Sequence, residues 1–565
     1  MVEAEDAAGC HGQHHDLDHG RGQDPAHGGD DMPSARDRGR GEDEEAETET
    51  LLAADDKKTP ILVQVVSAEG AAADEKCEKP IDAVVEAKKH HASRRQLMAC
   101  CAVASVNLLG GVCLAHSSSL IPALEGPDSE VPVEKHHAAW IASALVLAVP
   151  VGSLVSLCVN DYVGRLSLCK LISVPFFVGM ALIASAGSLS QVVAGRLVLG
   201  LAAGIWHGPS VLYISEVADK NIRGGLGAFG PAVASLGILV CYAMGAALHW
   251  RTHAWLNCLL PLVTLALLYA LAMETPVWLR AHGSPEAAAA ASLYFYNDPD
   301  KVLSVASGGK KKKKRERTGA AAWRMLFLDP RGYKPLIIIH AVFIVQQIVG
   351  IYISIYYAVS FFKETGSTID PYMATILIGV VRLVGCSGVS LVLSRLGRRP
   401  LMIASSLGQA AAMAVSGYAS RRILAGDSVS SMWVVAGVLV YILFACLGWQ
   451  VLPWSMMAEL FPHEVRSAAQ PLNTGVVHFY MFVFLQLYPT VLDLVGGAAN
   501  LMFLFSGTSA LSAVFVFVFL PETRGRTLAE IEEYFRHNTT FLTERRRQRR
   551  EREARREAQR ARGAV

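Results

Sequence analysis

The amino-acid sequence predicts an all-α, polytopic membrane protein with twelve transmembrane helices in two halves of six. The composition is too apolar for a soluble multidomain enzyme, because 52% of the 565 residues are hydrophobic and the mean hydropathy is +0.32. Ionisable side chains concentrate in residues 1–96 and 521–565. Between these ends lie twelve apolar segments of spanning length, and motifs around the first six recur around the last six.

Residues 1–96 are expected to form a disordered cytosolic tail, because they carry many charged and few aromatic side chains. They lack the pattern of a signal peptide, so the first span, near residue 98, is expected to act as an internal signal-anchor. Histidines without cysteines at ligand spacing are a weak metal signal, and no metal or other cofactor is expected. The tail histidines are His11, His14, His15, His19 and His27. The eleven cysteines are scattered and indicate no disulfide framework.

Segments of the roughly 20 residues needed to cross hydrocarbon follow in quick succession. The first six lie near 98–120, 136–159, 168–188, 191–217, 226–249 and 253–273. The other six lie near 334–360, 372–393, 400–419, 431–455, 468–490 and 495–520. The sequence therefore predicts a first bundle at 97–273, a cytosolic linker at 274–333, a second bundle at 334–522 and a charged cytosolic tail at 523–565.

Basic residues in the short loops predict the orientation, because they favour the cytosolic side. One set of loops carries Arg165, Lys170, Lys220, Arg223, the basic run from Lys310, Arg395, Arg398, Arg399 and Arg466. The opposite loops carry fewer: Lys135, Arg251, Lys363, Arg421 and Arg422. We therefore expect both termini and the linker in the cytosol.

The two halves repeat each other. Asp161–Arg165 is echoed by Ser394–Arg399, Glu216 with Arg223 by Glu459 with Arg466, and Glu274-Thr-Pro by Pro521-Glu-Thr. The offsets from Gly164 to Gly397, from Glu216 to Glu459 and from Glu274 to Glu522 are 233, 243 and 248 residues. Three ordered echoes at nearly constant offset predict a duplicated six-helix unit, the construction of many alternating-access transporters.

At these motifs the sequence resembles the sugar porter family of the major facilitator superfamily, over about residues 98–535. The motifs are Gly195-Arg196, Glu216…Arg223-Gly224, Gln346-Gln347-x-x-Gly350, Pro453-Trp454 with Glu459…Arg466, and Pro521–Arg526. Within the family, Phe362–Val381 and Gly237–Cys241 are most similar to the facilitated trehalose transporters. The resemblance implies the major facilitator fold.

The resemblance also implies a cytosolic network of gating ion pairs that holds the outward-facing state. Its residues would be Asp161, Arg165, Arg196, Glu216, Arg223, Arg398, Glu459, Arg466 and Glu522. The alternative is that these charges only set the topology. The network departs from the family pattern at Ser394, Leu166 and Val277.

Polar side chains in the apolar segments of the second half are the candidate substrate site. Gln346 and Gln347 lie within an apolar helix, where an amide needs a partner or a wet cavity, and an amide suits sugar hydroxyls because it both donates and accepts. The indole of Trp454 can stack on a pyranose. The candidate set is Gln346, Gln347, Tyr352, Tyr356, Arg382, Gln450, Trp454 and His478. The alternatives are hydrogen bonding between packed helices for the glutamines, and lipid-facing or core packing for Trp454.

Several positions depart from the family pattern, so the sequence leaves the solute open. These are Pro231, Tyr352, Arg382, Cys446, Gln450, Val477 and His478. Arg382 is expected near the middle of the eighth span, without an acid at comparable depth. The resemblance implies that a proton-linked member carries an Asp in the first span. Residues 98–120 contain no acid, and His116 is their one titratable candidate, so proton coupling is not expected.

The sequence thus favours a facilitative carrier for a glucose- or trehalose-like mono- or disaccharide in the plasma membrane, working by alternating access. Two alternatives remain: a carrier of an anionic or atypical organic solute that uses Arg382, and a transport-inactive sugar sensor or scaffold. The expected partners are a small sugar and the lipid bilayer, with no nucleic acid, and a monomer is expected. No constellation of a nucleophile with a base indicates an enzyme.

Overall fold

The computed structural model describes residues 94–127, 129–283, 285–296, 320–524, 526 and 528–537, all within one compact unit. The expected tail up to residue 93, the basic run from Lys310 and residues 538–565 lie outside the described residues. The regular secondary structure of the described chain is helical throughout, which confirms the all-α prediction.

The first half contains six spans, of which the third and sixth are each made of two consecutive helices. The helices are α4 (Val106–Leu124), α5 (Lys135–Val163), α6 (Arg165–Leu171), α7 (Ser173–Ala184), α8 (Leu189–Val217), α9 (Lys220–Ala247), α10 (Trp250–Asn257) and α11 (Leu259–Leu271). A helical stretch leads into α4, so that the first span runs over Arg94–Leu124 and starts three residues before the expected boundary at 97.

The second half also contains six spans, and two of them are interrupted. Its helices are α16 (Pro330–Ile348), α17 (Ile353–Tyr356), α18 (Ala358–Lys363), α19 (Pro371–Arg395), α20 (Arg398–Leu424), α21 (Met432–Leu447), α22 (Leu452–Glu459), α23 (His463–Val495) and α24 (Ala498–Phe519). The seventh span breaks between α16 and α17, where Gly350 has a φ of 89°, and the tenth breaks between α21 and α22.

Ten helical segments of the described chain are long and apolar enough to cross a membrane. The seventh span is not among them because of its break. The ninth, α20, is not among them because it carries a buried face of serines and one glutamine, although its 27 residues extend about 40 Å. Serines on this face bond to neighbouring helices, for example Ser416 Oγ to the Val434 carbonyl at 2.8 Å. With these two the spans number twelve.

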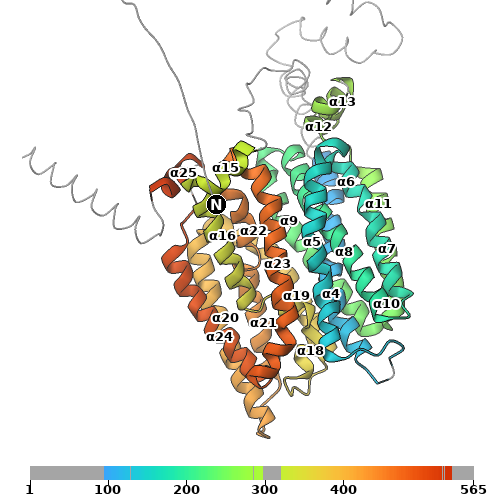
Figure 1. The fold of residues 1–565 in the computed structure, drawn as a ribbon, viewed down its shortest axis with the longest axis vertical. Coiled ribbons are helices and arrows are strands. Elements are labelled where there is room, and N and C mark those ends of the chain that lie inside the picture. Colours follow the sequence, from blue (N-terminus) through green and yellow to red (C-terminus); the bar gives the residue numbers. More distant parts are fainter. Residues whose placement is uncertain are drawn as a thin grey trace, which may run out of the picture. The chain divides into compact units, whose positions relative to one another are not determined.

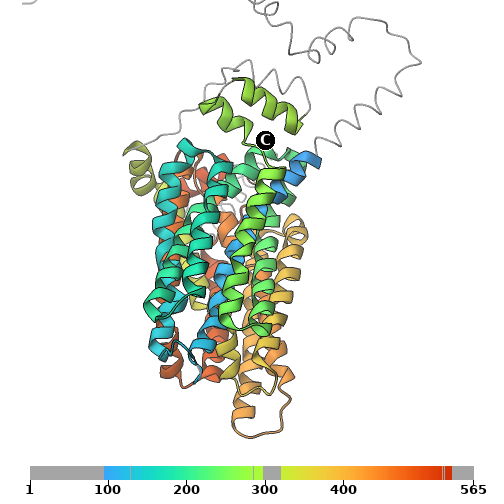
Figure 2. The ribbon, with the colours of Figure 1, turned by 90° about the vertical axis from the view of Figure 1, so that its right-hand side faces the viewer.

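The two halves stand side by side, the first coloured blue to green and the second yellow to red (Figure 1). The short helices α12 (Pro276–His282) and α13 (Pro285–Tyr296) lie beyond one end of the spans, as the two views show (Figure 2). The helices α15 (Ala320–Leu328) and α25 (Leu528–His537) belong to the same end. We call this end the linker side, and the end with the loop between α4 and α5 the opposite side.

Hydrogen bonds join the two halves near the opposite side. They are Ser117 Oγ to the Tyr356 carbonyl (3.2 Å), the Val359 amide to Ser118 Oγ (3.2 Å), the Tyr242 hydroxyl to the Ile355 carbonyl (2.9 Å) and Ser143 Oγ to Gln486 Oε1 (2.7 Å). Each of these residues lies in the part of its span nearer the opposite side. One turn before Gln486 in α23, Phe482 packs against Trp140 of α5 at 6.0 Å between ring centroids. The halves are therefore held together at that end.

Candidate functional site

The break in the seventh span faces the break in the tenth, and Gln346 connects them. Its Nε2 donates a hydrogen bond to the carbonyl of Trp449, which lies between α21 and α22. Gln346 Oε1 and Gln347 Nε2 have no hydrogen-bond partner among the described residues, although Gln346 is fully buried and Gln347 is 3% exposed. A buried polar group left in this way costs about 1–3 kcal/mol. Two unpaired amide atoms beside two broken helices therefore indicate a place for a polar ligand.

Five candidate residues form one chain of contacts across four spans. Arg382 Nη1 donates to Gln450 Oε1 at 3.3 Å, and the Gln450 side chain also pairs with the Tyr352 hydroxyl. The Tyr352 hydroxyl accepts from Trp454 Nε1 at 3.1 Å. The Trp454 ring lies 5.7 Å from the His478 ring. The structure thus brings together residues that the sequence spreads over more than a hundred positions, from Tyr352 to His478.

Arg382 is buried within this chain of contacts, and no carboxylate of the described residues lies beside it. The residue is 3% exposed, and its Nε has no partner among the described residues. The titratable side chains that interact electrostatically with its guanidinium are those of Cys446, Cys386, Tyr242 and Tyr352. The guanidinium therefore keeps donor capacity for a ligand or water.

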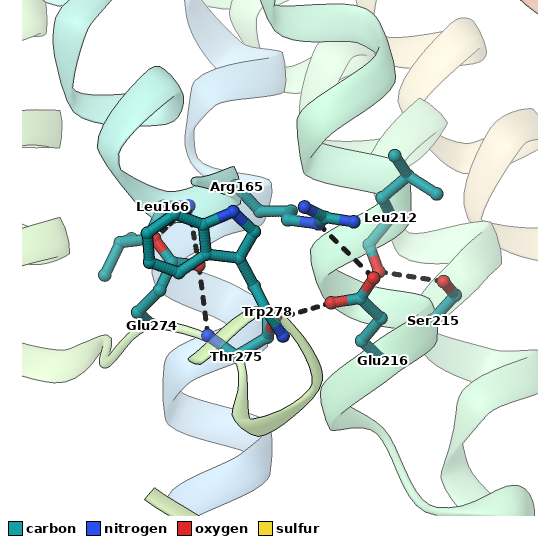
Figure 3. Close-up of polar contacts among 8 residues, drawn as sticks. All are labelled: Arg165, Leu166, Leu212, Ser215, Glu216, Glu274, Thr275 and Trp278. Carbon is teal, nitrogen blue, oxygen red and sulfur yellow. Dashed lines mark hydrogen bonds and ion pairs between the residues drawn. The ribbon is translucent and has the colours of Figure 1, made fainter. Parts of the chain in front are cut away.

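On the linker side of the first half, two acids hold three segments together (Figure 3). Arg165 Nε lies 3.3 Å from Glu216 Oε1, and Thr275 Oγ1 donates to Glu216 Oε2 at 2.5 Å. Glu274 accepts from the Leu166 amide at 3.0 Å, and it also accepts from the amides of Ser167 and Thr275. Because helix α6 begins at Arg165, the Glu274 carboxylate satisfies amides that have no partner within the helix.

The second half repeats this arrangement. Arg398 Nη2 lies 3.1 Å from Glu459 Oε1, and Thr523 Oγ1 donates to Glu459 Oε2 at 2.7 Å. Glu522 accepts from the amides of Arg398 and Arg399 at 3.0 and 3.1 Å, at the start of α20. The ion pairs of these two clusters, Arg165–Glu216 and Arg398–Glu459, thus each join residues of the same half.

The sequence matches a family model described as sugar (and other) transporter over residues 84–535, which is most of the chain. The chain belongs to the sugar (and other) transporter family. Its relatives include the facilitated trehalose transporter Tret1 of Drosophila yakuba, 32% identical over 443 residues, covering 77% of this chain and 51% of the relative. Tret1 of Bombyx mori is 29% identical over 441 residues, covering 77% of this chain and 86% of the relative. The chain spans about half the length of several of the Drosophila relatives.

Solved structures of the xylose transporter XylE have the same fold as this family member. The inward open conformation from E. coli has a TM-score of 0.64 at 21% identity, and covers 77% of this chain and 98% of that one. The proton:xylose symporter bound to 6-bromo-6-deoxy-D-glucose has a TM-score of 0.63 at 22% identity, with coverages of 78% and 99%. These likenesses confirm the major facilitator fold. The family and the apolar spans together show a multi-pass membrane protein.

Arg196 was expected among the linker-side gating residues, but it lies apart from both linker-side clusters. It is fully buried in the first half, and it donates from Nε to the Ile141 carbonyl and from Nη1 to the Cys113 carbonyl, both at 2.9 Å. Tyr356 is a titratable neighbour of Arg196, and its buried hydroxyl has no partner among the described residues. The position of Arg196 well inside α8, with apolar residues on both sides, is the sequence signal that would have placed it at depth.

Three expected gating residues cannot be compared with the structure. The side chains of Asp161, Arg223 and Arg466 lie outside the described part of the chain. Sequence reasoning did not select Thr275 and Thr523, which bind Glu216 and Glu459. The signal was present in the Glu-Thr pairs of the two echoes, at 274–275 and 522–523.

Proposed function

We propose that this chain is a facilitative carrier for a glucose- or trehalose-like mono- or disaccharide, working by alternating access in the plasma membrane. The observation that carries the proposal is the site between the broken seventh and tenth spans. Its free polar atoms, Gln346 Oε1 and Gln347 Nε2, are one acceptor and one donor. Such a mixed set fits the hydroxyls of a neutral sugar. Relatives named as facilitated trehalose transporters support this substrate class.

We also propose that the linker side faces the cytosol and that the structure represents an inward-facing state. Hydrogen bonds between the halves near the opposite side support this state, because they keep that entrance closed. The topology is tested at Asn538-Thr-Thr540, a glycosylation sequon that never meets the lumen if the tail is cytosolic. Glycan on Asn538 would reverse the orientation.

Uptake by the purified full chain in liposomes tests the substrate class. Labelled trehalose and glucose should enter down their gradients without a proton gradient. Gln347→Ala should reduce uptake by raising KM, because it removes an unpaired amide that faces the break. Gln409→Ala is the matched control, since Gln409 is also a buried glutamine of the second half with one unpaired amide atom, and its Nε2 donates to Ser405 within α20.

The control separates loss of substrate contacts from loss of packing. If both variants lower uptake in proportion to the folded fraction, the amide of Gln347 serves packing only. If neither sugar enters through wild-type protein that remains monodisperse, the carrier proposal fails for these sugars. The protein would then either transport another solute or transport none.

A further inference from the structure

The first turn of α5, on the opposite side, brings three metal-ligating side chains together. His136 Nδ1 lies 3.4 Å from Glu134 Oε2, and His137 Nδ1 lies 3.9 Å from the same oxygen. The two imidazole rings are 3.9 Å apart between centroids. One ligand atom from each residue can be chosen so that all three lie within 4.8 Å of one another.

These separations are close to those of a tetrahedral zinc site. Zinc binds imidazole nitrogen and carboxylate oxygen at roughly 2.0–2.2 Å, so two ligand atoms on a tetrahedron are about 3.3–3.6 Å apart. The 3.4 Å between His136 Nδ1 and Glu134 Oε2 already lies in this range, and the 3.9 Å to His137 lies slightly beyond it. The three ligand atoms lie within 4.8 Å of one another, and side-chain rotation on zinc binding would bring them to tetrahedral separations.

The surroundings leave these three residues available. Their side chains are 75%, 70% and 45% exposed for Glu134, His136 and His137, so water can occupy the remaining position. Glu134 stands at the N-cap of α5 without a side-chain capping bond, so metal binding takes nothing from the helix. The nearby Glu130 is paired with Arg251 at 2.5 Å and is not a competing ligand.

Electrostatics explain why the carboxylate is needed. The N-terminus of a helix carries a partial positive charge, which disfavours a cation. Two neutral imidazoles alone do not offset this charge. The Glu134 carboxylate supplies the negative charge at the point where both imidazole nitrogens converge.

We propose that Glu134, His136 and His137 bind a zinc ion at the surface, with solvent as the remaining ligand. This site lies on a different element from the candidate sugar site and is independent of the proposed transport activity. Two imidazoles and one carboxylate with an open position are a ligand set typical of zinc.

Histidine footprinting of the purified full chain tests the site residue by residue, so histidines of the N-terminal tail do not confuse the readout. The protein, first freed of metal with a chelator, is treated with diethyl pyrocarbonate at increasing zinc chloride, and each histidine is followed by mass spectrometry. Zinc should protect His136 and His137 together, saturably, and chelator should reverse the protection. The exposed His249, which also lies on the opposite side, is the internal control and should stay reactive.

The Glu134→Gln variant removes the charge and keeps the side-chain size. It should need about tenfold or more zinc for the same protection, the scale expected when a metal site loses a supporting group. Three results would overturn the proposal: no protection at about 1 mM zinc, a value that corresponds to weak binding; equal protection of His249; or unchanged protection in Glu134→Gln. Circular dichroism checks that the variant keeps its helices.

Discussion

Tyr242 and Tyr441 each donate a hydroxyl hydrogen bond of 2.9 Å to a backbone carbonyl in the interrupted seventh span. Tyr242, of the first half, reaches the Ile355 carbonyl, and Tyr441, of the second half, reaches the Val349 carbonyl. One bond therefore crosses between the halves and the other stays within one half. The pair offers two chemically matched bonds, of which only one must break if the halves separate on the opposite side.

Tyr242→Phe should favour opening on the opposite side. Losing one hydrogen bond changes the free energy by about 0.5–1.5 kcal/mol, which is about two- to thirteenfold in the ratio of the two states. Labelling of a cysteine introduced at Ser117, which lies within this closure, should become faster in Tyr242→Phe. Tyr441→Phe is the control and should leave the labelling rate unchanged while lowering thermal stability by a similar amount. Equal rates in the two variants would contradict the assignment of this bond to the gate.

Arg466→Ala should increase the linker-side-open population and slow transport. Arg466 lies in the first turn of α23 on the linker side, and removing a cation there weakens the attraction expected to draw the halves together in the outward-facing state. The measurement is the accessibility of a cysteine introduced at the exposed Ser215, beside Glu216. Arg395→Ala, with the same change of charge on the same side, should have little effect. Unchanged accessibility of Ser215→Cys in Arg466→Ala would count against the gating role.

Gly164→Ala and Gly397→Ala should both destabilise the linker side, by different amounts. A Cβ at Gly164 would lie 2.7 Å from Glu274 Oε2, and one at Gly397 would collide with the Glu522 carboxylate, so each would push the acid away from the helix start that it caps. Gly164 also has a φ of 97°, which adds backbone strain of about 1–3 kcal/mol for a residue with a side chain. The apparent Tm should therefore fall most in Gly164→Ala.

Gly187→Ala is the control for both glycine variants. A Cβ at Gly187 meets no atom within 4 Å, so its apparent Tm should match the wild type. If Gly397→Ala were as stable as this control, the Glu522 carboxylate would not depend on the close approach that the structure shows.

Arg382→Asn should change which solutes are bound. Its guanidinium bonds to Gln450 and lies in the same chain of contacts as Tyr352 and Trp454. For a neutral sugar, the smaller Asn should raise KM by about tenfold, the equivalent of about 1.4 kcal/mol of lost hydrogen bonding. For an anionic solute the loss should be much larger, because a carboxylate and an arginine form a charge-assisted pair.

The measurement for Arg382 is uptake by wild type and variant over a panel of neutral sugars and their acid forms. Arg382→Lys serves as the second variant, because it keeps the charge and loses the planar donor geometry. If Arg382→Asn leaves affinity and selectivity unchanged for every transported solute, Arg382 has a packing role only.

Hydropathy and repetition predicted the fold of this chain because both can be recognised in the sequence without knowing which segments pack together. A segment of about 20 apolar residues is stable as a helix in hydrocarbon whatever its neighbours are, since its backbone groups bond within the helix. The echo of Glu274-Thr in Glu522-Thr predicted two equivalent halves for a similar reason. Each Glu-Thr pair follows the last span of its half, and each carboxylate meets the start of a helix in that same half.

Tertiary structure decided which polar residues meet, because burial and side-chain direction depend on packing between distant segments. Arg196 and Arg398 are both arginines beside a glycine, yet the first donates to buried carbonyls and the second pairs with Glu459 at the linker side. The contact of Gln450 with both Arg382 and Tyr352 exists only because α19 and the two broken spans converge. The sequence by itself determined the spans and their repetition, whereas the chain of contacts from Arg382 to Trp454 depends on how the helices pack in the bundle.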